Sequence, residues 1–387
     1  MGKIQIGWKK YFGVLAAVIL ILTLAACSAA PVTSTTSSPL ISRTQPTLAP
    51  TTSTPAQTVV QVTPTPTPSF SPSPSPTPTT TTPSPSPSPT PTPEPPPPTS
   101  PIYTPTAAAF KPSGTQADLF QYMLGLINQD RQAAGINPVV LNYNAAAQQH
   151  AQDMLDKNYQ AAHWGTDGLK PYMRYTAAGG LNYEGENSAY YSSNQPVNLK
   201  QKLQELQSTM MAEIAPNDSH KVTMLNKWHK KVNLGIAYNT NTLCLVQQFE
   251  GDYVEYSKPP TLNGKILSLT GHFLQQTIKL QNIFITYDDP PKPLTTAQLN
   301  QDQYHHYDFG QRVGVILPPP PPGQTYSSIP SDAVIPTRAN FDYNGWFYLE
   351  TDITPILSKG PGVYNVVLVT MIANEQVRMT NYSLFVK

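Results

Sequence analysis

A long tract of proline and small polar residues constrains this chain more than any other feature. From about residue 31 to residue 107 the sequence is dominated by Pro, Thr and Ser, as in TPTPTPSFSPSPSPTPTTTTPSPSPSPTPTPEPPPP. Proline lacks a backbone N–H and fixes φ, so this tract favours extended polyproline II over helix or sheet. We therefore predict a disordered stalk over residues 27–113, which is either a bare spacer or a target for O-glycosylation.

The residues before the stalk have the pattern of an export signal. Three lysines (Lys3, Lys9 and Lys10) precede the apolar run GVLAAVILILTLAAC, which is short for a membrane-spanning helix. Its end, LAAC, resembles the lipobox of bacterial lipoproteins, and this resemblance implies a signal peptide over residues 1–26 and acylation of Cys27. The chain would then be lipid-anchored on the extracellular side of a bacterial cell membrane. An ordinary signal peptide or an uncleaved anchor with an incidental cysteine is the alternative.

The rest of the chain is long enough for two domains of ordinary size. The whole sequence has 12% charged residues and a formal net charge of +1, and it contains no concentrated basic segment. Because binding to phosphate backbones needs a clustered positive surface, we expect no nucleic-acid partner.

The first domain, residues 114–256, shows helical periodicity followed by strand patterns. We predict helices over 116–134, 142–159 and 198–214 and a hairpin of two strands over 231–239 and 242–250. The residues expected on the buried helix faces are Leu119, Met123, Leu126, Ile127, Ala147, Ala151, Met154, Leu155, Leu203, Leu206, Met210 and Ile214.

Ionisable residues gather in the stretch from His163 to His220. In a chain with seven histidines, this stretch contains two of them together with Glu186 and Glu213, each beside glycine or polar residues. Two imidazoles and two carboxylates are sufficient for a metal site or for proton transfer. The sequence alone does not establish that the four side chains meet.

Six segments in order resemble the CAP superfamily of cysteine-rich secretory proteins, antigen 5 and pathogenesis-related proteins, in its disulfide-free bacterial form. They are LINQDRQAAG, NAAAQQHAQDM, HWGTDGLKPYMRYTAAG, YEGEN, DSHKVTML and VNLGIAY. The resemblance implies an α-β-α sandwich around an antiparallel sheet. It also implies a cavity lined by His163, Glu186, Glu213 and His220, with Glu205 as the alternative to Glu213.

The chemistry of this tetrad stays open between three hypotheses. The residues could be structural or weakly bind a divalent metal such as Zn²⁺ through His163 and His220, they could line a ligand cavity, or they could be catalytic. A peptidase would need an activated nucleophile, and no Ser, Thr or Cys lies in a recognisable nucleophile motif. A metal-dependent hydrolase therefore remains an alternative to non-catalytic binding.

The other histidines and the second cysteine have simpler interpretations. We expect His150 to be a packing or surface residue and His229, between lysines, to lie in a solvated loop. His305 and His306 could form an accessory metal site but are more typical of a loop. Cys244 lies in an apolar strand and has no second cysteine to pair with once Cys27 is acylated, so we expect a buried thiol.

Residues 259–387 alternate β-forming and polar residues between Pro- and Gly-rich turns. This pattern predicts an antiparallel β-sandwich, so the chain as a whole is of the α+β class. Three aromatic residues, Tyr343, Trp346 and Tyr348, either pack between the sheets or stack on sugars at the surface.

Two classes of function follow from these features. The first is non-catalytic binding at the cell surface, in which the cavity takes a lipid, a cell-wall glycan fragment or a peptide. The second is a secreted metal-dependent hydrolase or peptidase that uses the His/Glu cavity. Adhesion through the β-sandwich, including self-association, is a further alternative. The sequence gives no indication of the oligomeric state.

Overall fold

The computed structural model describes residues 3–5, 109–275, 277–320, 322–336, 338–343 and 345–387, without the side chains of residues 3–5, 342 and 343. Cys27, nearly all of the predicted signal peptide and most of the stalk lie outside these ranges. Lys3–Gln5, within the predicted signal peptide, forms strand β1 and pairs with β3. No helix in the described ranges is long and apolar enough to cross a bilayer.

The first domain is built around a five-stranded sheet with the order β1-β3-β5-β4-β2. The pairs are antiparallel except β2–β4, which is parallel, so the sheet differs at this edge from the wholly antiparallel one expected. Asn239 makes the predicted turn, because its Oδ1 accepts the backbone N–H groups of Asn241 and Thr242 at 2.9 Å each. The strands after β1 are β2 (Val140–Asn142), β3 (Glu184–Ser192), β4 (Lys231–Tyr238) and β5 (Thr242–Glu250).

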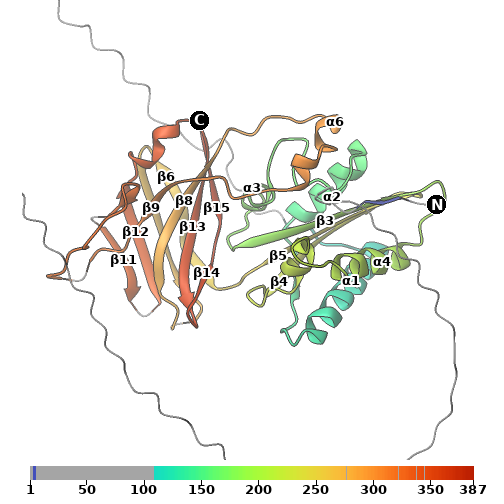
Figure 1. Ribbon diagram of the computed structural model, residues 1–387, viewed down its shortest axis with the longest axis horizontal. Helices are drawn as coiled ribbons and strands as arrows, with labels where there is room; N and C mark the ends of the chain where they lie inside the picture. The colour runs from blue at the N-terminus through green and yellow to red at the C-terminus, as the bar shows by residue number, and fades with distance from the viewer. Residues whose placement is uncertain (1–2, 6–108, 276, 321, 337, 344) are drawn as a thin grey trace, which may run out of the picture. The chain divides into compact units, whose positions relative to one another are not determined.

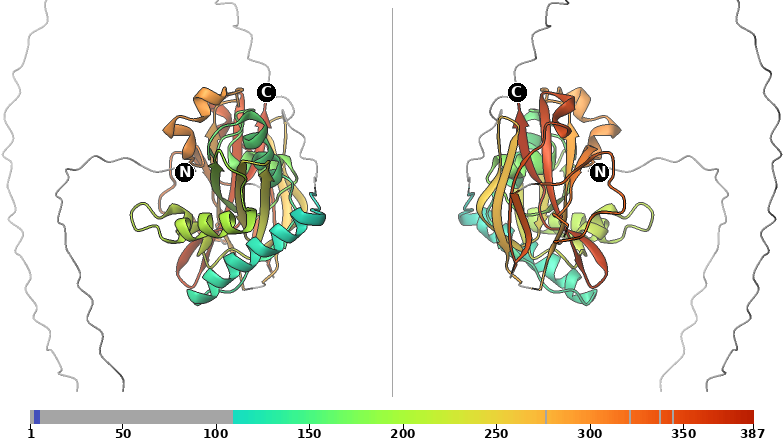
Figure 2. Two further views of the ribbon diagram at one scale, coloured as in Figure 1. Left: turned by 90° about the vertical axis from the view of Figure 1, so that its right-hand side faces the viewer. Right: turned by 90° about the vertical axis from the view of Figure 1, so that its left-hand side faces the viewer.

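Helices cover both faces of this sheet. On one face, α1 (Gly114–Ala133) and α4 (Leu199–Met211) pack their predicted apolar stripes on alternate residues of β4 and β5, and Figure 2 shows these cyan and yellow-green helices on the same side. On the other face, α2 (Ala146–Lys157) packs Ala147, Ala151 and Met154 against Cys244 and Val246. The short helices α3 (Pro171–Ala177) and α5 (Ser219–Met224) lie in the connections that position the site.

The second domain consists of two sheets (Figure 1). One has the order β10-β9-β8-β13-β14, with β15 also paired to β13, and the other has the order β11-β12-β7-β6. The strands are β6 (Val254–Asn263), β7 (Ile266–Phe273), β8 (Leu280–Asp288), β9 (Gln311–Ile316), β10 (Ala333–Val334), β11 (Arg338–Tyr343), β12 (Trp346–Asp352), β13 (Gly362–Ile372), β14 (Glu375–Arg378) and β15 (Tyr382–Val386). A helix, α6 (Thr296–Leu299), and two 3-10 turns, η1 (Asp302–His305) and η2 (Ile356–Lys359), lie in the connections.

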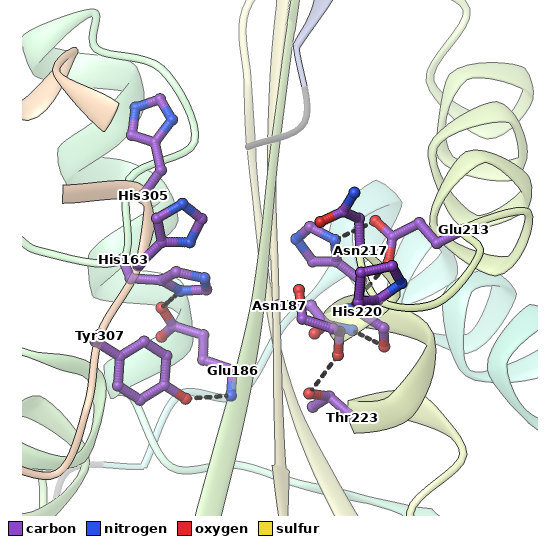
Figure 3. A pocket seen from close by; sticks show the side chains of 12 residues that line it. His163, Glu186, Asn187, Glu213, Asn217, His220, Thr223, His305 and Tyr307 are labelled. Atoms are coloured by element: carbon purple, nitrogen blue, oxygen red, sulfur yellow. Dashed lines mark hydrogen bonds and ion pairs between the residues drawn. The ribbon is translucent and has the colours of Figure 1, made fainter. Parts of the chain in front are cut away.

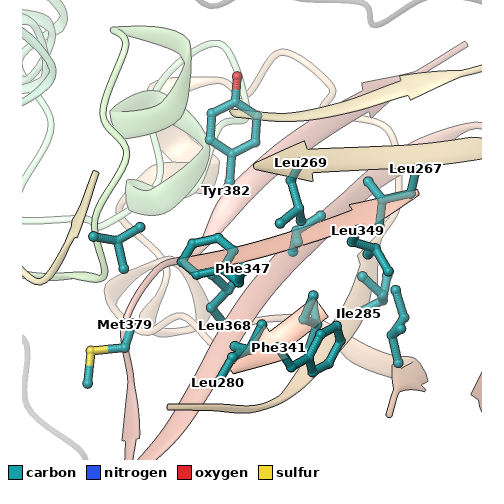
Figure 4. Close-up of a cluster of buried hydrophobic side chains, with 14 of the residues drawn as sticks. Leu267, Leu269, Leu280, Ile285, Phe341, Phe347, Leu349, Leu368, Met379 and Tyr382 are labelled. Carbon is teal, nitrogen blue, oxygen red and sulfur yellow. The ribbon is translucent and has the colours of Figure 1, made fainter. Parts of the chain in front are cut away.

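The two sheets share one hydrophobic core (Figure 4). Leu269, Phe347 and Leu349 from the four-stranded sheet meet Ile285 and Leu368 from the six-stranded sheet, and all five are at most 2% exposed. Along β12, Phe347 and Leu349 alternate with exposed residues, as expected for a strand with one face in the core and one in solvent.

Strands β13 and β15 of the six-stranded sheet are buried on both faces. Strand β13 is buried from Gly362 to Thr370 without alternation, because its outer face contacts the first domain. Leu169, Tyr172 and Met173 from the first domain form a cluster there with Val363 and Phe385. The two domains therefore meet through an apolar contact, and the outer face of the four-stranded sheet is left exposed.

Three details of the predicted boundaries are wrong. The second domain starts at Val254 rather than at residue 259, and Pro259 and Pro260 lie inside β6. Proline is tolerated there because β6 is an edge strand with register irregularities around Lys258. Ile214 lies beyond the end of α4 and is 80% exposed, so it does not belong to the buried stripe.

Candidate functional site

A pocket of about 290 Å³ lies at the predicted tetrad. Figure 3 shows His163 and Glu186 on one side of this pocket and Glu213 and His220 on the other. All four tetrad residues thus line a single pocket. The full lining is His163, Glu186, Asn187, Glu213, Pro216, Asn217, Ser219, His220, Thr223, His305, His306 and Tyr307.

On one side, Arg174 of α3 joins His163 to Glu186 of β3. Its guanidinium donates two bonds to the Glu186 carboxylate at 3.0 and 3.1 Å and two to the carbonyls of His163 and Leu169 at 2.9 and 2.7 Å. His163 Nδ1–H donates to Glu186 Oε1 at 3.1 Å. Burial alone would raise the pKa of Glu186, but the Arg174 charge and the nearby histidines lower it to about 2. Glu186 is therefore an anion fixed by a bidentate pair.

On the other side, His220 and Glu213 form a second pair. His220 Nδ1–H donates to Glu213 Oε1 at 2.5 Å, and Glu213 Oε2 accepts the backbone N–H of His220 at 3.1 Å. Asn187 of β3 donates to the His220 carbonyl at 3.1 Å and to Gln247 at 3.2 Å, which ties the start of α5 to the sheet. Glu213 lies just beyond the end of α4, so its position depends on the loop between α4 and α5.

The two carboxylates set the tautomers of the two imidazoles. Because Nδ1 of each histidine donates to a glutamate, Nε2 of the neutral ring carries a lone pair. Desolvation lowers the pKa of His163, which favours this neutral form. A carboxylate behind the imidazole is typical of a metal-ligating histidine. Yet no three His, Cys, Asp or Glu side chains within the described ranges come together as a metal-binding group. Each imidazole is thus held as a metal ligand often is, but the described residues contain no group of three such side chains that would bind an ion.

The pKa of a second buried glutamate on β3, Glu184, is shifted in the opposite direction. Burial and the neighbouring Glu186 charge raise the pKa of Glu184 well above its ordinary value, although Arg174 opposes this. Glu184 is fully buried but does not line the pocket. The motif YEGEN thus supplies one carboxyl group whose pKa is lowered and one whose pKa is raised.

Part of the pocket wall comes from the second domain. The connection between β8 and β9, residues 289–310, which we name the strap, brings His305, His306 and Tyr307 to the tetrad. The Tyr307 ring packs edge-on against His163 with ring centroids 4.9 Å apart, and its hydroxyl accepts the backbone N–H of Glu186 at 3.0 Å. Burial lowers the pKa of His305, so this imidazole too is neutral near pH 7.

Hydrogen bonds and ring contacts attach the strap to the loop that contains His163. The backbone N–H of His163 donates to the Tyr304 carbonyl at 2.8 Å, and Trp164 Nε1–H donates to the His306 carbonyl at 3.0 Å. Lys170 is nearly buried and donates to Asp308 at 2.7 Å and to Asp288 at 2.8 Å. The strap and the first domain are therefore packed as one structure around the pocket.

Other candidate residues from the sequence lie outside the pocket. Glu205, the alternative to Glu213, is on the surface of α4 and pairs with Lys202. His150 is buried, as one of its two interpretations allowed, and its Nε2–H donates to the Ala162 carbonyl at 2.9 Å. Cys244 is fully buried, and burial raises the pKa of its thiol to about 12. Cys244 is therefore the buried thiol that the sequence predicts, and it is not a reactive nucleophile in the folded chain.

One expectation about the histidines is wrong. His229 is not in a solvated loop: it is 4% exposed and stacks on Phe249, with ring centroids 5.5 Å apart. His305 and His306 lie in a loop connection, as expected, but they also line the same pocket as His163 and His220, which was not expected. The sequence contains a signal for the role of His305 and His306. They lie in the strap, which is much longer than the usual connection between paired strands, and long connections often carry function.

Comparisons with known proteins agree with the domain predicted from the sequence. Residues 124–249 match the family described as CAP, cysteine-rich secretory protein family. Among solved structures, an extracellular protein with an SCP domain from Bacillus anthracis is 19% identical, with a TM-score of 0.29 over 37% of this chain and 45% of that one. This chain thus spans less than half of its length. An outer surface protein of Borrelia burgdorferi is 14% identical, with a TM-score of 0.28 over 38% of this chain and 100% of that one. No curated protein matches the chain.

Proposed function

Since residues 124–249 form a CAP domain, we propose that this protein is a non-catalytic binding protein anchored through Cys27 on the extracellular side of a bacterial membrane. Its pocket takes a polar group from a cell-wall fragment or a peptide. The observation that carries this proposal is that both glutamates of the tetrad are engaged in holding imidazoles. The pocket therefore offers ring nitrogens, amides and hydroxyls, which recognise hydrogen-bonding ligands.

The size and polarity of the pocket favour a small polar ligand over a lipid chain. A volume of about 290 Å³ is at the small end of the range of about 300–1,000 Å³ that is usual for ligand pockets. An acyl chain placed there would remove water from the side-chain amide of Asn217 and from Nε2 of His220 without replacing its hydrogen bonds, which is unfavourable. A sugar ring or a short peptide segment would satisfy them.

A metal-dependent hydrolase is the second candidate, and one observation favours it. Each imidazole of the pair His163 and His220 is oriented by a carboxylate, as metal ligands commonly are. An ion bound there would supply Lewis-acid chemistry. Against it, no three His, Cys, Asp or Glu side chains among the described residues come together to hold an ion.

Binding of soluble peptidoglycan fragments and short peptides, measured by isothermal titration calorimetry, tests the proposal. The full chain would carry Cys27→Ser to prevent acylation. We expect His220→Ala and Glu213→Gln to reduce affinity at least about tenfold, which corresponds to about 1.4 kcal/mol. Glu205→Gln, a matched change at an exposed glutamate outside the pocket, should have no effect.

Two results would contradict this proposal. Unchanged binding by His163→Ala and His220→Ala would place the ligand elsewhere on the chain. Cleavage of peptides that requires added Zn²⁺ and disappears in both variants would favour the hydrolase instead.

The anchor is tested separately. In a bacterial host we expect the wild-type chain to partition into the detergent phase after extraction and to carry acyl chains at Cys27 in mass spectra. Cys27→Ala should remain in the aqueous phase, since two or more acyl chains are what make membrane attachment stable. A Cys27→Ala chain that stays membrane-bound would indicate an uncleaved anchor.

A further inference from the structure

The outer face of the four-stranded sheet carries two exposed aromatic side chains on one strand. Trp346 and Tyr348 of β12 are 48% and 45% exposed. Because they are two residues apart in a strand, they lie on the same face, about 6.6 Å apart along the strand direction. The intervening Phe347 points into the core (Figure 4). The two rings therefore form a platform at the surface that the core does not use.

Polar side chains of the neighbouring strands surround the two rings. The strand register places His272 beside Trp346, and Asn340 and Thr270 on either side of Tyr348. The His272 ring lies 4.6 Å from the Trp346 ring, centroid to centroid, so the indole is supported at its flank. Aromatic surface and hydrogen-bonding groups thus alternate across the face.

The charges on this face are largely paired with each other. Arg338 Nη1 lies 2.8 Å from Glu350, and His272 Nε2 lies 3.6 Å from Glu255. Lys258, opposite Thr270, adds a positive charge and Asp352, at the end of β12, adds a negative one. The two positive side chains, Arg338 and Lys258, nearly balance the three carboxylates, so the face does not match a polyanion or a polycation. It matches a neutral partner.

We propose that this face, centred on Trp346 and Tyr348, binds an extended neutral polysaccharide strand. A pyranose ring presents C–H groups on its face and hydroxyls around its edge. The C–H groups complement the electron-rich face of an aromatic ring, and the hydroxyls meet side chains such as Asn340 and Thr270. Two rings spaced along one strand suit successive sugars of a chain better than a single compact ligand. This site is separate from the pocket and does not depend on the function proposed for it.

Co-sedimentation of the full Cys27→Ser chain with insoluble chitin and with purified cell-wall polysaccharide tests this inference. Soluble oligosaccharides would be titrated in parallel, with tryptophan fluorescence as the readout. Trp346→Ala and Tyr348→Ala should each weaken binding about tenfold, and Trp346→Phe should lose less because it keeps a ring. Glu205→Gln, on the surface of α4 in the first domain, should bind these polysaccharides as the parent chain does.

Tyr143→Ala is the matched control, because Tyr143 is also an exposed tyrosine but lies in the first domain. Circular dichroism melts should be nearly unchanged for the Trp346, Tyr348 and Tyr143 variants, since all three residues are exposed at the surface. If Trp346→Ala melted early, Tyr348→Ala and Trp346→Phe would still test the site.

Three results would overturn the proposal. If Trp346→Ala and Tyr348→Ala each bound the polysaccharides as tightly as the parent chain, the platform would be excluded as the binding site. Equal loss in Tyr143→Ala would show that the effect is not specific to it. Concentration-dependent dimerisation abolished by Trp346→Ala, without any polysaccharide binding, would identify the face as an interface between two copies of the chain.

Discussion

The Tyr307 hydroxyl accepts the backbone N–H of Glu186 at 3.0 Å, although the two residues belong to different domains. Glu186 in turn fixes His163, which also donates its backbone N–H to the Tyr304 carbonyl of the strap at 2.8 Å. One side of the pocket is therefore held by contacts from the second domain, and the geometry of this side depends on how the strap packs.

Removing this hydroxyl should destabilise the chain without altering the shape of the pocket wall. In Tyr307→Phe the buried N–H of Glu186 loses its acceptor, which costs about 1–3 kcal/mol. Urea unfolding measures the difference. Tyr122→Phe removes an exposed tyrosine hydroxyl bonded to Gln204 at 3.3 Å and should change stability by less than about 0.5 kcal/mol. Equal effects in the two variants would mean that the Tyr307 bond contributes nothing particular.

The contact between the strap and Gly168 should tolerate no side chain. A Cβ on Gly168 would lie 2.1 Å from the Lys292 carbonyl oxygen, and its φ is +78°. We expect Gly168→Ala to displace the strap, to lower the melting temperature and to accelerate proteolysis within residues 289–310.

Gly264→Ala is the control that separates the steric clash at Gly168 from the cost of placing alanine in a left-handed backbone conformation. Gly264 has a φ of +58°, and a Cβ added there would have no atom within 4 Å, so Gly264→Ala carries only the left-handed backbone penalty of about 1–2 kcal/mol. A Gly168→Ala chain no less stable than Gly264→Ala would contradict the close packing of the strap.

Arg174 should not be replaceable by lysine. Its guanidinium makes two bonds to Glu186 and two to backbone carbonyls in a buried setting, and an ammonium group cannot reproduce this planar fork. Arg174→Lys should cost about 3–5 kcal/mol, because it leaves a buried carboxylate poorly paired. Chemical denaturation gives this value, and Arg338→Lys at the exposed pair with Glu350 serves as the control, with an expected change below about 1 kcal/mol. Comparable losses of stability in the two variants would show that the buried Arg174–Glu186 pair contributes no more than the exposed pair.

His229 should make folding stability sensitive to acid. Burial, with a smaller effect of Arg131, lowers its pKa from 6.5 to about 3. Below pH 6.5 the unfolded chain takes up a proton that the folded chain does not, so stability is highest above pH 6.5 and falls as the pH approaches 3. Urea unfolding from pH 7.5 to pH 4 should show a shallower pH dependence in His229→Gln than in the wild type. Parallel curves would show that His229 does not titrate in this way.

Much of the first domain could be predicted from local pattern. The periodic apolar residues of α1, α2 and α4 and the hairpin of β4 and β5 lie where the sequence placed them, because each depends on spacing within one segment. His163, Glu186 and His220 were identified by the order of short motifs, and Glu213 by a weaker match. That these four share one pocket with His305 depends on packing between segments far apart in the chain.

The outward direction of Trp346 has a local signal in the strand period. Residues 346, 348, 350 and 352 share one face of β12 by the two-residue period, and Glu350 and Asp352 mark that face as the solvated one. The burial of His229 had no such local signal, since its lysine neighbours suggest solvent and its stacking partner Phe249 comes from another element.

The sequence by itself determined the α+β class and the residues of the tetrad, and it predicts an export signal and a proline-rich stalk, because these follow from composition, spacing and motif order. The tertiary structure alone decided that the strap completes the pocket, that β13 and β15 of the second domain are buried on both faces, and that the four-stranded sheet presents Trp346 and Tyr348 to solvent. The physical reason is that burial and hydrogen bonding between distant segments are set by which surfaces pack together, and a local pattern specifies only that a surface is apolar or polar.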